Sequence, residues 1–564
     1  MAATPPTPTF VELFTPKIVT VFREGYRLAD LRADCVSGLT VAIVALPLSM
    51  AIAIASGVTP ERGLITTIVG GFLVSLLGGS RFQVGGPAGA FIVLVAATVA
   101  QHGVDGLLLA TFLSGVMLLA VGLLRLGTFI KYIPYPVTVG FTAGIAIIIF
   151  ASQVAQLLGL TVQGAEPGAL VPKLVALGRA LPTTNPAAVA MTALTIAAIV
   201  AVRRFRPRWP AFLIGVVLGS VVAWALKLPV DTLGSRFGEL PRSLPLPRLP
   251  EFSYAKIVDV LPAALAFTLL GGIESLLSAV VADSMSGRRH RSNCELAAQG
   301  VANMGSALFG GFCVTGTIAR TATNVRAGAK GPISGMLHAA FVLVFLVVAG
   351  PLASYIPLAA LASVLAVVCW NMAERDAFAS LLRATRGDAV VLMVTFLLVV
   401  FRSLIEGIVV GFSLGALLFL HRMAQAVEVE AMDDRADSGR PYDPTYVTDP
   451  DVMVCRITGA FFFGAAANVA AALDRLGERP KAYVLDVSAV AVIDSTAAVT
   501  IEGFVRKAAR RGAGVLIVGA GAAVARTLAQ HGVGPPDVRL MADVQTAVAA
   551  AHRGFSARTV SLAE

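Results

Sequence analysis

The sequence predicts an α-helical domain that crosses a membrane many times, followed by a small α/β domain. Of the 564 residues, 56% are hydrophobic and only 14% are charged, whereas soluble globular proteins carry about 25% charged residues. Long apolar runs fill residues 34–423, and beyond them the chain becomes polar and continues with the composition of a soluble domain. Two interrupted segments with similar residues lie in the two halves of the apolar region. Paired interruptions are typical of secondary transporters and indicate where the substrate binds.

The change in composition predicts four parts of the chain. Basic residues give positions 17–32 an amphipathic pattern, which is typical of a segment lying on the cytoplasmic membrane surface. The soluble domain has about 120 residues, a usual size for a single domain. The four parts are a cytoplasmic N-terminal segment at 1–32, a membrane domain at 33–423, a linker at 424–447 and the soluble domain at 448–564.

The membrane domain contains fourteen apolar segments. A full span needs about 20 residues, so the segments that begin at 86 and 317 are short enough to be half-helices. With a cytoplasmic N-terminus, the basic loops near 203–208, 288–291 and 375–386 all lie on the cytoplasmic side, as the positive-inside rule requires. Fourteen segments return the C-terminus to the cytoplasm, and seven in each half make the halves inverted relative to each other. The segments are 34–57, 62–78, 86–101, 106–124, 135–158, 185–203, 210–226, 259–283, 293–309, 317–328, 332–350, 356–373, 387–402 and 404–422.

In the soluble domain, expected strands and helices alternate, which predicts a small sheet covered by helices. The expected strands are Val452–Ile457, Tyr483–Val487 and Val515–Val518. The expected helices are Ala465–Leu476, Ser495–Arg510 and Ala522–Gln530.

The two interrupted segments share a pattern. Each has a Gly-Gly pair, Gly78-Gly79 or Gly310-Gly311, then a short extended piece ending in Val, another Gly and the start of a helix. Broken backbone inside a membrane is tolerated only where it is buried in protein or lines a cavity. Because a helix N-terminus carries roughly half a positive charge and free N–H groups, two of them facing each other would bind an anion. The pattern therefore predicts an anion transporter.

We expect the anion to bind between the two helix starts. Small residues there let backbone N–H groups approach a ligand closely, although Gly-rich stretches also form packing seams between membrane helices. Pro47 and Ser49 should bend the first span beside the site, with simple kinking as the alternative. The predicted substrate-binding residues at the helix starts are Gly86, Pro87, Ala88, Gly89, Ala90, Phe91, Thr315, Gly316, Thr317, Ile318, Ala319 and Arg320.

Glu274 lies in the middle of an apolar span, where a carboxylate costs about 2.5–3.5 kcal/mol and is functional by default. If Glu274 faces the anion, protonating it removes the repulsion between two negative charges, which is a physical route to proton-coupled symport. Ser278 lies one turn later on the same helix face and could supply a hydroxyl to this coupling site. The alternative is a structural ion pair between Glu274 and Arg320, and Arg320 could instead neutralise the substrate.

Glu295, Gln299 and Asn303 form a polar stripe on one predicted helix. We interpret the stripe as hydrogen-bonding residues that hold the helices together. A coupling pathway for protons is the alternative interpretation.

These residues resemble the sulfate permease (SulP) family of anion transporters, over nearly the whole chain. The C-terminal part is similar to a STAS domain, with Asp486-Val487-Ser488 and Ile493-Asp494-Ser495-Thr496-Ala497. Within the family, the run at 318–335 and Ala373-Glu374 look closest to the bacterial C4-dicarboxylate (aerobic succinate) carrier branch. The motifs of the membrane domain are Leu46-Pro47-Leu48-Ser49-Met50-Ala51, Gly79-Ser80-Arg81-Phe82, Gly86-Pro87, Ile273-Glu274-Ser275-Leu276-Leu277, Asn293-Cys294-Glu295-Leu296 and Ala319-Arg320-Thr321.

The resemblance implies a 7+7 inverted repeat divided into a core domain and a gate domain, with elevator-like movement of the core. It also implies a homodimer in which the STAS domains make contacts, and the STAS domain is a candidate contact for a cytoplasmic protein partner. Some family members with Asp in place of Glu274 use sodium instead, whereas Glu favours a proton without proving it. Ser495 matches a serine that is phosphorylated in small bacterial STAS proteins, but Ala497 replaces their usual Gly. We expect Ser495 to lie at a helix N-cap after Asp494, which is a sufficient structural role, and phosphorylation is the less favoured alternative.

We therefore predict a secondary-active transporter of the bacterial inner membrane, with both termini cytoplasmic, that carries a small anion with a proton. The predicted anion is a C4-dicarboxylate such as fumarate or succinate, or sulfate. The alternatives are a sodium-coupled bicarbonate symporter, an anion exchanger, an uncoupled anion channel, and nucleobase uptake on the same fold. We expect no catalytic residue, cofactor, metal or nucleic-acid partner, because no P-loop, metal-ligand cluster or Ser–His–Asp arrangement is present in the sequence.

Overall fold

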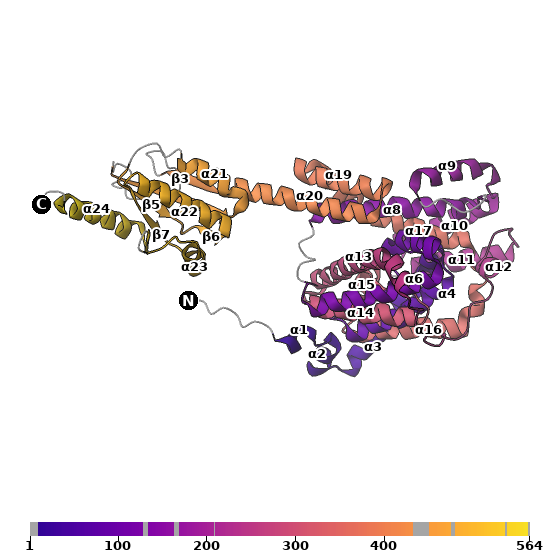
Figure 1. The fold of residues 1–564 in the computed structure, drawn as a ribbon. Coiled ribbons are helices and arrows are strands. Elements are labelled where there is room, and N and C mark those ends of the chain that lie inside the picture. Colours follow the sequence, from indigo (N-terminus) through magenta and orange to yellow (C-terminus); the bar gives the residue numbers. More distant parts are fainter. Residues whose placement is uncertain are drawn as a thin grey trace. The chain divides into compact units, whose positions relative to one another are not determined.

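The protein is described by a computed structural model in which the chain forms two compact units, Met1–Phe412 and Ser413–Glu564. Figure 1 shows the helices and strands of both units. Each unit is described by itself. The described residues are 9–127, 134–162, 169–207, 209–431, 451–474, 480–535 and 538–561.

Each of the fourteen predicted apolar segments contains a helix, and the predicted helical membrane domain is confirmed. The third and fourth segments share α6, which is kinked at Gly103 (φ 70°) between them. Among the described residues, nine helices are long and apolar enough to cross a membrane. The helices of the segments are α3 (Leu28–Ala55), α4 (Pro60–Ile65) with η1 (Thr66–Gly70) and α5 (Gly71–Leu77), η2 (Gly89–Phe91) with α6 (Ile92–Leu123), α8 (Tyr135–Leu158), α10 (Pro186–Phe205), α11 (Ala211–Ala225), α13 (Tyr254–Ser286), α14 (Ser292–Leu308), α15 (Ile318–Arg326), α16 (Ile333–Ala353), α17 (Leu358–Met372), α19 (Arg386–Phe401) and α20 (Leu404–Gln425).

Helix packing in this unit joins segments that are far apart in the sequence. The helix α14 packs along α6, α16 packs along α3, and α19 packs along α8. The helix α13 contacts both α6 and α15, and these helices lie in one group in Figure 1. The helices α6 and α15, which follow the two interrupted segments, thus both pack against α13.

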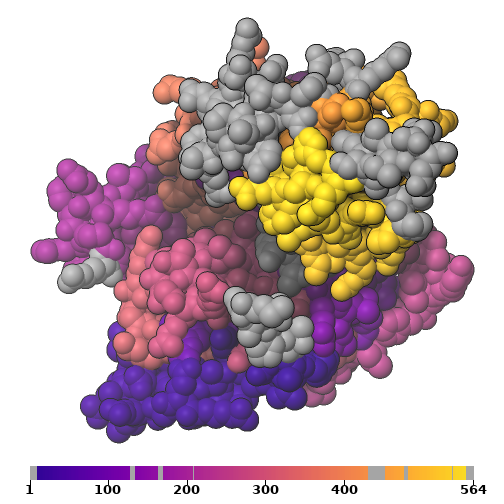
Figure 2. All heavy atoms as spheres, turned by 90° about the vertical axis from the view of Figure 1, so that its left-hand side faces the viewer, coloured from indigo at the N-terminus to yellow at the C-terminus, as the bar shows by residue number. Residues whose placement is uncertain are grey.

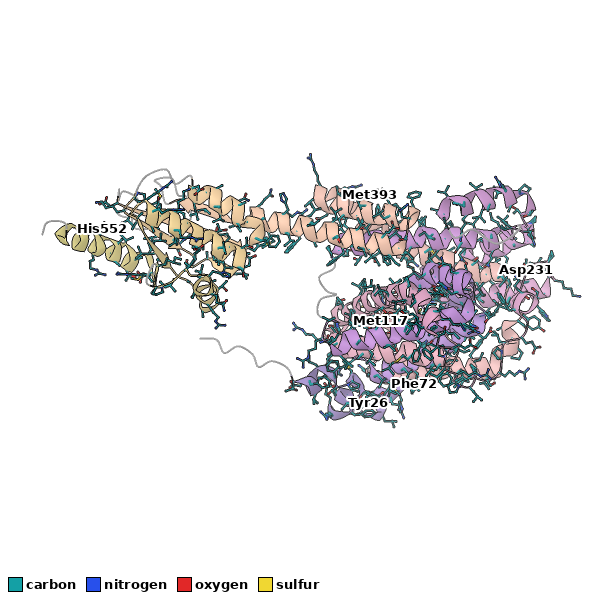
Figure 3. The ribbon with its side chains drawn as sticks, viewed as in Figure 1. Tyr26, Phe72, Met117, Asp231, Met393 and His552 are labelled. Carbon is teal, nitrogen blue, oxygen red and sulfur yellow. The ribbon has the colours of Figure 1, made fainter. Side chains whose placement is uncertain are left out.

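The N-terminal segment forms two short helices, α1 (Phe10–Phe14) and α2 (Lys17–Arg23), before α3 begins. Figure 2 shows these first helices in indigo along the lower edge of the view. Arg291 holds the segment to the start of α14 by donating to the carbonyl oxygen of Thr15 at 2.7 Å. At the turn into α3, the hydroxyl of Tyr26, labelled in Figure 3, donates to Asp34 at 2.6 Å.

Further short helices lie in the connections of the membrane unit and were not predicted. Their apolar stretches are too short to distinguish from loops in a sequence, because isolated helices of fewer than about 12 residues depend on tertiary contacts. They are α9 (Leu170–Ala180), η3 (Leu181–Thr183), α12 (Leu233–Phe237) and α18 (Arg375–Arg383).

The second unit is a sheet with helices, as predicted. Its strand order is β3-β4-β5-β7-β8, with β6 also paired to β4. The pairs β4–β5, β5–β7 and β7–β8 are parallel and β3–β4 is antiparallel. All residues of β5 are buried, as expected for a central strand. The elements are β3 (Glu428–Ala431), β4 (Val452–Phe461), α21 (Phe463–Asp474), β5 (Ala482–Asp486), β6 (Val490–Ile493), α22 (Ser495–Arg510), β7 (Gly514–Val518), α23 (Ala522–Gln530), β8 (Val538–Met541) and α24 (Val544–Ser561).

The three predicted strands correspond to β4, β5 and β7, and the three predicted helices to α21, α22 and α23. The predicted helix end at Leu476 and the part of the predicted linker at 432–447 lie outside the described residues. At the start of that linker, residues 428–431 form β3, and Val427 packs in the core of this unit with Cys455 and Ile457. The strands β3, β6 and β8 each have only four residues, too few for a periodic pattern in the sequence.

Candidate functional site

Two short strands join the interrupted segments. β1 (Gly85–Gly86) pairs antiparallel with β2 (Thr315–Gly316), so that Gly85 lies opposite Gly316 and Gly86 lies opposite Thr315. All four residues are buried. Because the strands run in opposite directions, the helices that follow them start close together and run apart. The structure thus brings the two predicted sets of residues, 86–91 and 315–320, to one place.

Neither helix start is capped by a side chain. Ala88 precedes η2 and Thr317 precedes α15, and no side-chain hydrogen bond caps either start. The hydroxyl of Thr317 instead donates to the carbonyl oxygen of Val84 at 3.3 Å. Ile318 and Ala319 are exposed, so the first turn of α15 is accessible. Uncapped N–H groups at the positive ends of two helix dipoles favour an anion.

The strand pair leaves no room for side chains at two glycines. A Cβ atom on Gly86 would lie 2.0 Å from Nη1 of Arg320, and a Cβ atom on Gly316 would lie 1.9 Å from Nε2 of Gln83. Only glycine lets these two polar side chains cross the backbone at such close range. Arg320 of the second interrupted segment therefore lies against Gly86 of the first, and Gln83 of the first lies against Gly316 of the second.

Arg320 is fully buried, at 1% exposure, and reaches from α15 to the first two spans. Its Nη2 donates to Oγ of Ser49 at 2.9 Å and its Nη1 donates to Oγ1 of Thr67 at 3.3 Å. Thr67 lies in η1, a π-helical turn inside the second span, and such turns occur frequently at functional sites. Nε of Arg320 is buried and has no hydrogen-bond partner. The guanidinium is therefore held in position by two hydroxyls and keeps a free donor.

The helix α13 carries Glu274 to the level of the strand pair. Three residues before it, the carbonyl oxygen of Gly271 accepts a hydrogen bond from the hydroxyl of Thr315 at 3.1 Å. Oε2 of Glu274 is buried without a hydrogen-bond partner. Among the described residues, neither Glu274 nor Arg320 forms an ion pair. The predicted alternative of a structural pair between them is not present in this structure.

Ser278 has a structural partner on α15. Its hydroxyl donates to Oγ1 of Thr321 at 3.0 Å, and the same oxygen accepts from the backbone N–H of Val84 at 3.2 Å. Ser278 thus connects α13 with α15 and with the piece of chain before β1. It lies one turn from Glu274 on α13, as the spacing predicted.

The polar stripe on α14 holds the interrupted segments. Nε2 of Gln83 donates to Oε1 of Glu295 at 2.8 Å, and the N–H of Ser80 donates to Oε2 at 2.9 Å. Asn303 forms two hydrogen bonds with the backbone of Val314, at 2.8 and 3.0 Å. These contacts support the structural interpretation of the stripe, because those of Ser80 and Val314 satisfy backbone groups that lie outside a helix and that of Gln83 holds the same segment by its side chain.

Other predicted residues lie elsewhere in their elements. Pro47 lies inside α3 and lines an apolar groove. Ser495 was expected to cap a helix, and this was wrong. Asp494 is the N-cap of α22, and its carboxylate accepts from the N–H groups of Ala497 at 2.9 Å and Phe463 at 2.8 Å.

Three residues that build the site were missed. Thr67, Gln83 and Thr321 are buried and bind Arg320, Glu295 and Ser278 respectively. Their signal in the sequence is a polar residue inside or beside an apolar run, which by itself does not distinguish a site from helix packing. Within the described residues, no group of three His, Cys, Asp or Glu could hold a metal ion.

Comparisons with known proteins identify the family of this chain. The sequence matches the sulfate permease family over residues 31–395 and the STAS domain over residues 443–547. The chain belongs to the sulfate permease family. It is an anion transporter, not an enzyme, and the predicted family and C-terminal STAS domain are confirmed.

Several relatives of this sulfate permease family member have names that indicate a substrate. It is 40% identical to the putative sulfate transporter YvdB of Bacillus subtilis, over 88% of this chain and 93% of that protein. It is 30% identical to the bicarbonate transporter BicA of a Picosynechococcus species, over 91% of this chain and 93% of that protein. Neither name mentions a dicarboxylate, so the C4-dicarboxylate branch stays a prediction.

Solved structures share the fold of this family member. The murine anion transporter Slc26a9 in its inward-facing state superposes with a TM-score of 0.85 at 18% identity, covering 98% of this chain and 96% of that one. The transmembrane domain of a cyanobacterial BicA superposes with a TM-score of 0.60 at 29% identity, covering 69% of this chain and 98% of that one. The first likeness concerns the fold alone.

Proposed function

We propose that the protein imports a small inorganic oxyanion together with a proton, with sulfate as the first candidate and bicarbonate as the second. One observation carries the proposal: two uncapped helix starts meet beside a buried guanidinium. Two partial positive charges and one full charge in one place suit an anion. The names of the relatives favour sulfate and bicarbonate over the C4-dicarboxylate that we also predicted.

Glu274 is the proposed proton carrier. Its buried oxygen has no hydrogen-bond donor and no ion-pair partner among the described residues, so no direct contact compensates a negative charge on it. An anion bound at the helix starts would add repulsion, which a proton on Glu274 removes. Proton binding and anion binding therefore favour each other, and linkage requires the effect to be reciprocal.

We further propose that transport follows an elevator-like movement in a homodimer of the inner membrane, with both termini and the STAS domain in the cytoplasm. The basic loops of the sequence support this orientation. A cytoplasmic protein that contacts the STAS domain, and phosphorylation of Ser495, belong to the same proposal. Ser495 is the first residue of α22 and is exposed.

The test is uptake into proteoliposomes that contain the purified full chain. Labelled sulfate, bicarbonate and fumarate are offered in parallel, with and without an inward proton gradient and with and without sodium. We expect sulfate to accumulate only with the proton gradient. Accumulation driven by sodium would mean that sodium, and not a proton, is the coupling ion. Uptake of fumarate alone would favour the C4-dicarboxylate branch. Anion current without accumulation would indicate a channel.

Glu274→Gln tests the coupling group. The amide keeps the shape of the side chain and never ionises, so we expect anion binding to persist while proton-driven accumulation is lost. Glu251→Gln is the matched control, since Glu251 is exposed and lies in a connection before α13. Full proton-driven accumulation by Glu274→Gln would contradict the proposed coupling.

A further inference from the structure

An apolar groove of about 500 Å³ lies between α3, α11 and α16. It is more than three times the volume of a cavity of about 150 Å³ that binds benzene, so it could hold a much longer hydrocarbon. The groove is separate from the anion site, although it adjoins the same helix: Pro47 lines the groove, and Ser49, two residues later, holds Arg320.

Apart from Trp224 and Tyr355 at one end, the wall of the groove offers a ligand no free polar group. Residues of α3 and α16, such as Leu46, Met50 and Phe345, form one side and α11 forms the other. Away from that end, Ser220 carries a hydroxyl, which already donates to the carbonyl oxygen of Val216 at 2.8 Å. A ligand of the groove must therefore be held by apolar contact.

The length of the groove matches one leaflet of a bilayer. Along α11 the lining residues run from Leu213 to Trp224, and at 1.5 Å per residue this stretch measures about 16 Å. The hydrocarbon core of a bilayer is about 30 Å thick, so one leaflet contributes about 15 Å. A single acyl chain of one leaflet fits this length.

One end of the groove has the residues of a membrane interface. Trp224 near the end of α11 and Tyr355 just after α16 line this end and are more than half exposed. Both residue types are enriched where a membrane meets water. Lys227 follows three residues after Trp224 and is exposed, which places a positive charge where a lipid phosphate would lie.

We propose that the groove binds one acyl chain of a phospholipid, with the phosphate beside Trp224, Tyr355 and Lys227. The lipid comes from the leaflet in which α11 and α16 end. The chain then supports α3 from the side opposite Ser49, between helices of the two halves of the repeat. Neither the lipid site nor its test depends on the transported anion or on the coupling ion.

The experiment uses the full chain in vesicles of phosphatidylcholine and phosphatidylglycerol, with a trace of phosphatidylcholine that carries a diazirine in one acyl chain. After illumination, mass spectrometry maps the adducts. Leu46 is only 7% exposed and Phe345 is half-buried, so lipids that merely surround the protein reach them poorly. We expect adducts at both residues as well as on α11.

Ser220→Phe fills the groove and should reduce the adducts at Leu46 and Phe345 at least tenfold. Val200→Phe is the matched control, because Val200 on α10 is 55% exposed and does not line the groove. Adducts confined to exposed residues outside the groove, such as Val348 on α16, would overturn the proposal if they were found in the unmodified chain. Equal labelling of Leu46 in the unmodified chain and in Ser220→Phe would overturn it too. The first result needs no variant, so the test holds even if Ser220→Phe does not fold.

Discussion

The contact between Gly86 and Arg320 gives a sharp prediction for Gly86→Ala. The new Cβ atom would lie 2.0 Å from Nη1 and 2.7 Å from Cζ of Arg320, so the guanidinium must move. Moving it breaks the hydrogen bonds to Ser49 at 2.9 Å and Thr67 at 3.3 Å. Hydrogen bonds to a charged group contribute about 1.5–3 kcal/mol each, so even at the lower value the loss of both makes the native position less favourable by about 3 kcal/mol. If anion binding needs that position, the apparent Kd rises about a hundredfold.

Binding of labelled sulfate to the purified protein measures this effect, and thermal unfolding of the same samples checks that the variant folds. Gly350→Ala on α16 is the matched control, because its Cβ atom would meet only Cβ of Leu240 at 3.9 Å, an ordinary contact outside the site. We expect Gly350→Ala to bind within a few-fold of the unmodified protein. If the effect acts through Arg320, Gly86→Ala should add nothing to Arg320→Ala. Additive losses, or an unchanged Kd in Gly86→Ala, would refute the reasoning.

Two further predictions concern single contacts. Thr67→Val keeps the shape of the side chain and removes one acceptor of Arg320, so sulfate affinity should fall about tenfold, or about 1.4 kcal/mol; equal affinity would mean that Thr67 does not position the guanidinium. In the STAS domain, burial raises the pKa of Asp486, but hydrogen bonds from Ser488 and Arg456 outweigh burial and hold its pKa below the usual value. Its carboxylate therefore stabilises the folded domain above the unfolded pKa near 4, and this stability is lost as pH falls through the lowered value. Asp486→Asn should therefore lower the free energy of unfolding of this domain by about 2 kcal/mol at neutral pH and by much less in acid. Backbone hydrogen exchange in β4 and β5 should be faster in the variant at neutral pH. Equal exchange in the variant and the unmodified protein at neutral pH would count against this.

Much of the fold could be predicted from the sequence because its signals are local. Runs of apolar residues mark α3 and α8 directly, and the Gly-Gly pairs mark where helices stop. The helix α6 was divided correctly into two segments, since Gly103 kinks it where the apolar run weakens. The short strand β6 and the connection helix α9 were missed, because each depends on neighbours that are distant in the sequence.

The candidate site could be located but not built from the sequence. Its place follows from two helix starts, which are sequence features. The partners of Arg320 do not follow, because Ser49 and Thr67 lie more than 250 residues away and meet it only in the folded chain. The sequence also left open whether Glu274 and Arg320 form an ion pair. The structure shows that they do not, because Arg320 donates to Ser49 and Thr67 and the buried oxygen of Glu274 has no partner.

Because Glu274 and Arg320 are not paired, the proposed anion at the helix starts would meet their two charges separately. The guanidinium contributes one positive charge and the two helix starts contribute about half a charge each, so the site totals about +2 with Glu274 protonated and about +1 with it ionised. A divalent anion such as sulfate matches the protonated site, whereas a monovalent anion such as bicarbonate matches the ionised one. In Glu274→Gln the side chain is uncharged at every pH, so the site keeps the charge of about +2 that matches sulfate. The variant should therefore bind sulfate without pH dependence and should favour sulfate over bicarbonate more than the unmodified protein does. An equal change in both affinities would mean that Glu274 lies too far from the anion for its charge to matter, and the proton would then have to be carried by another group.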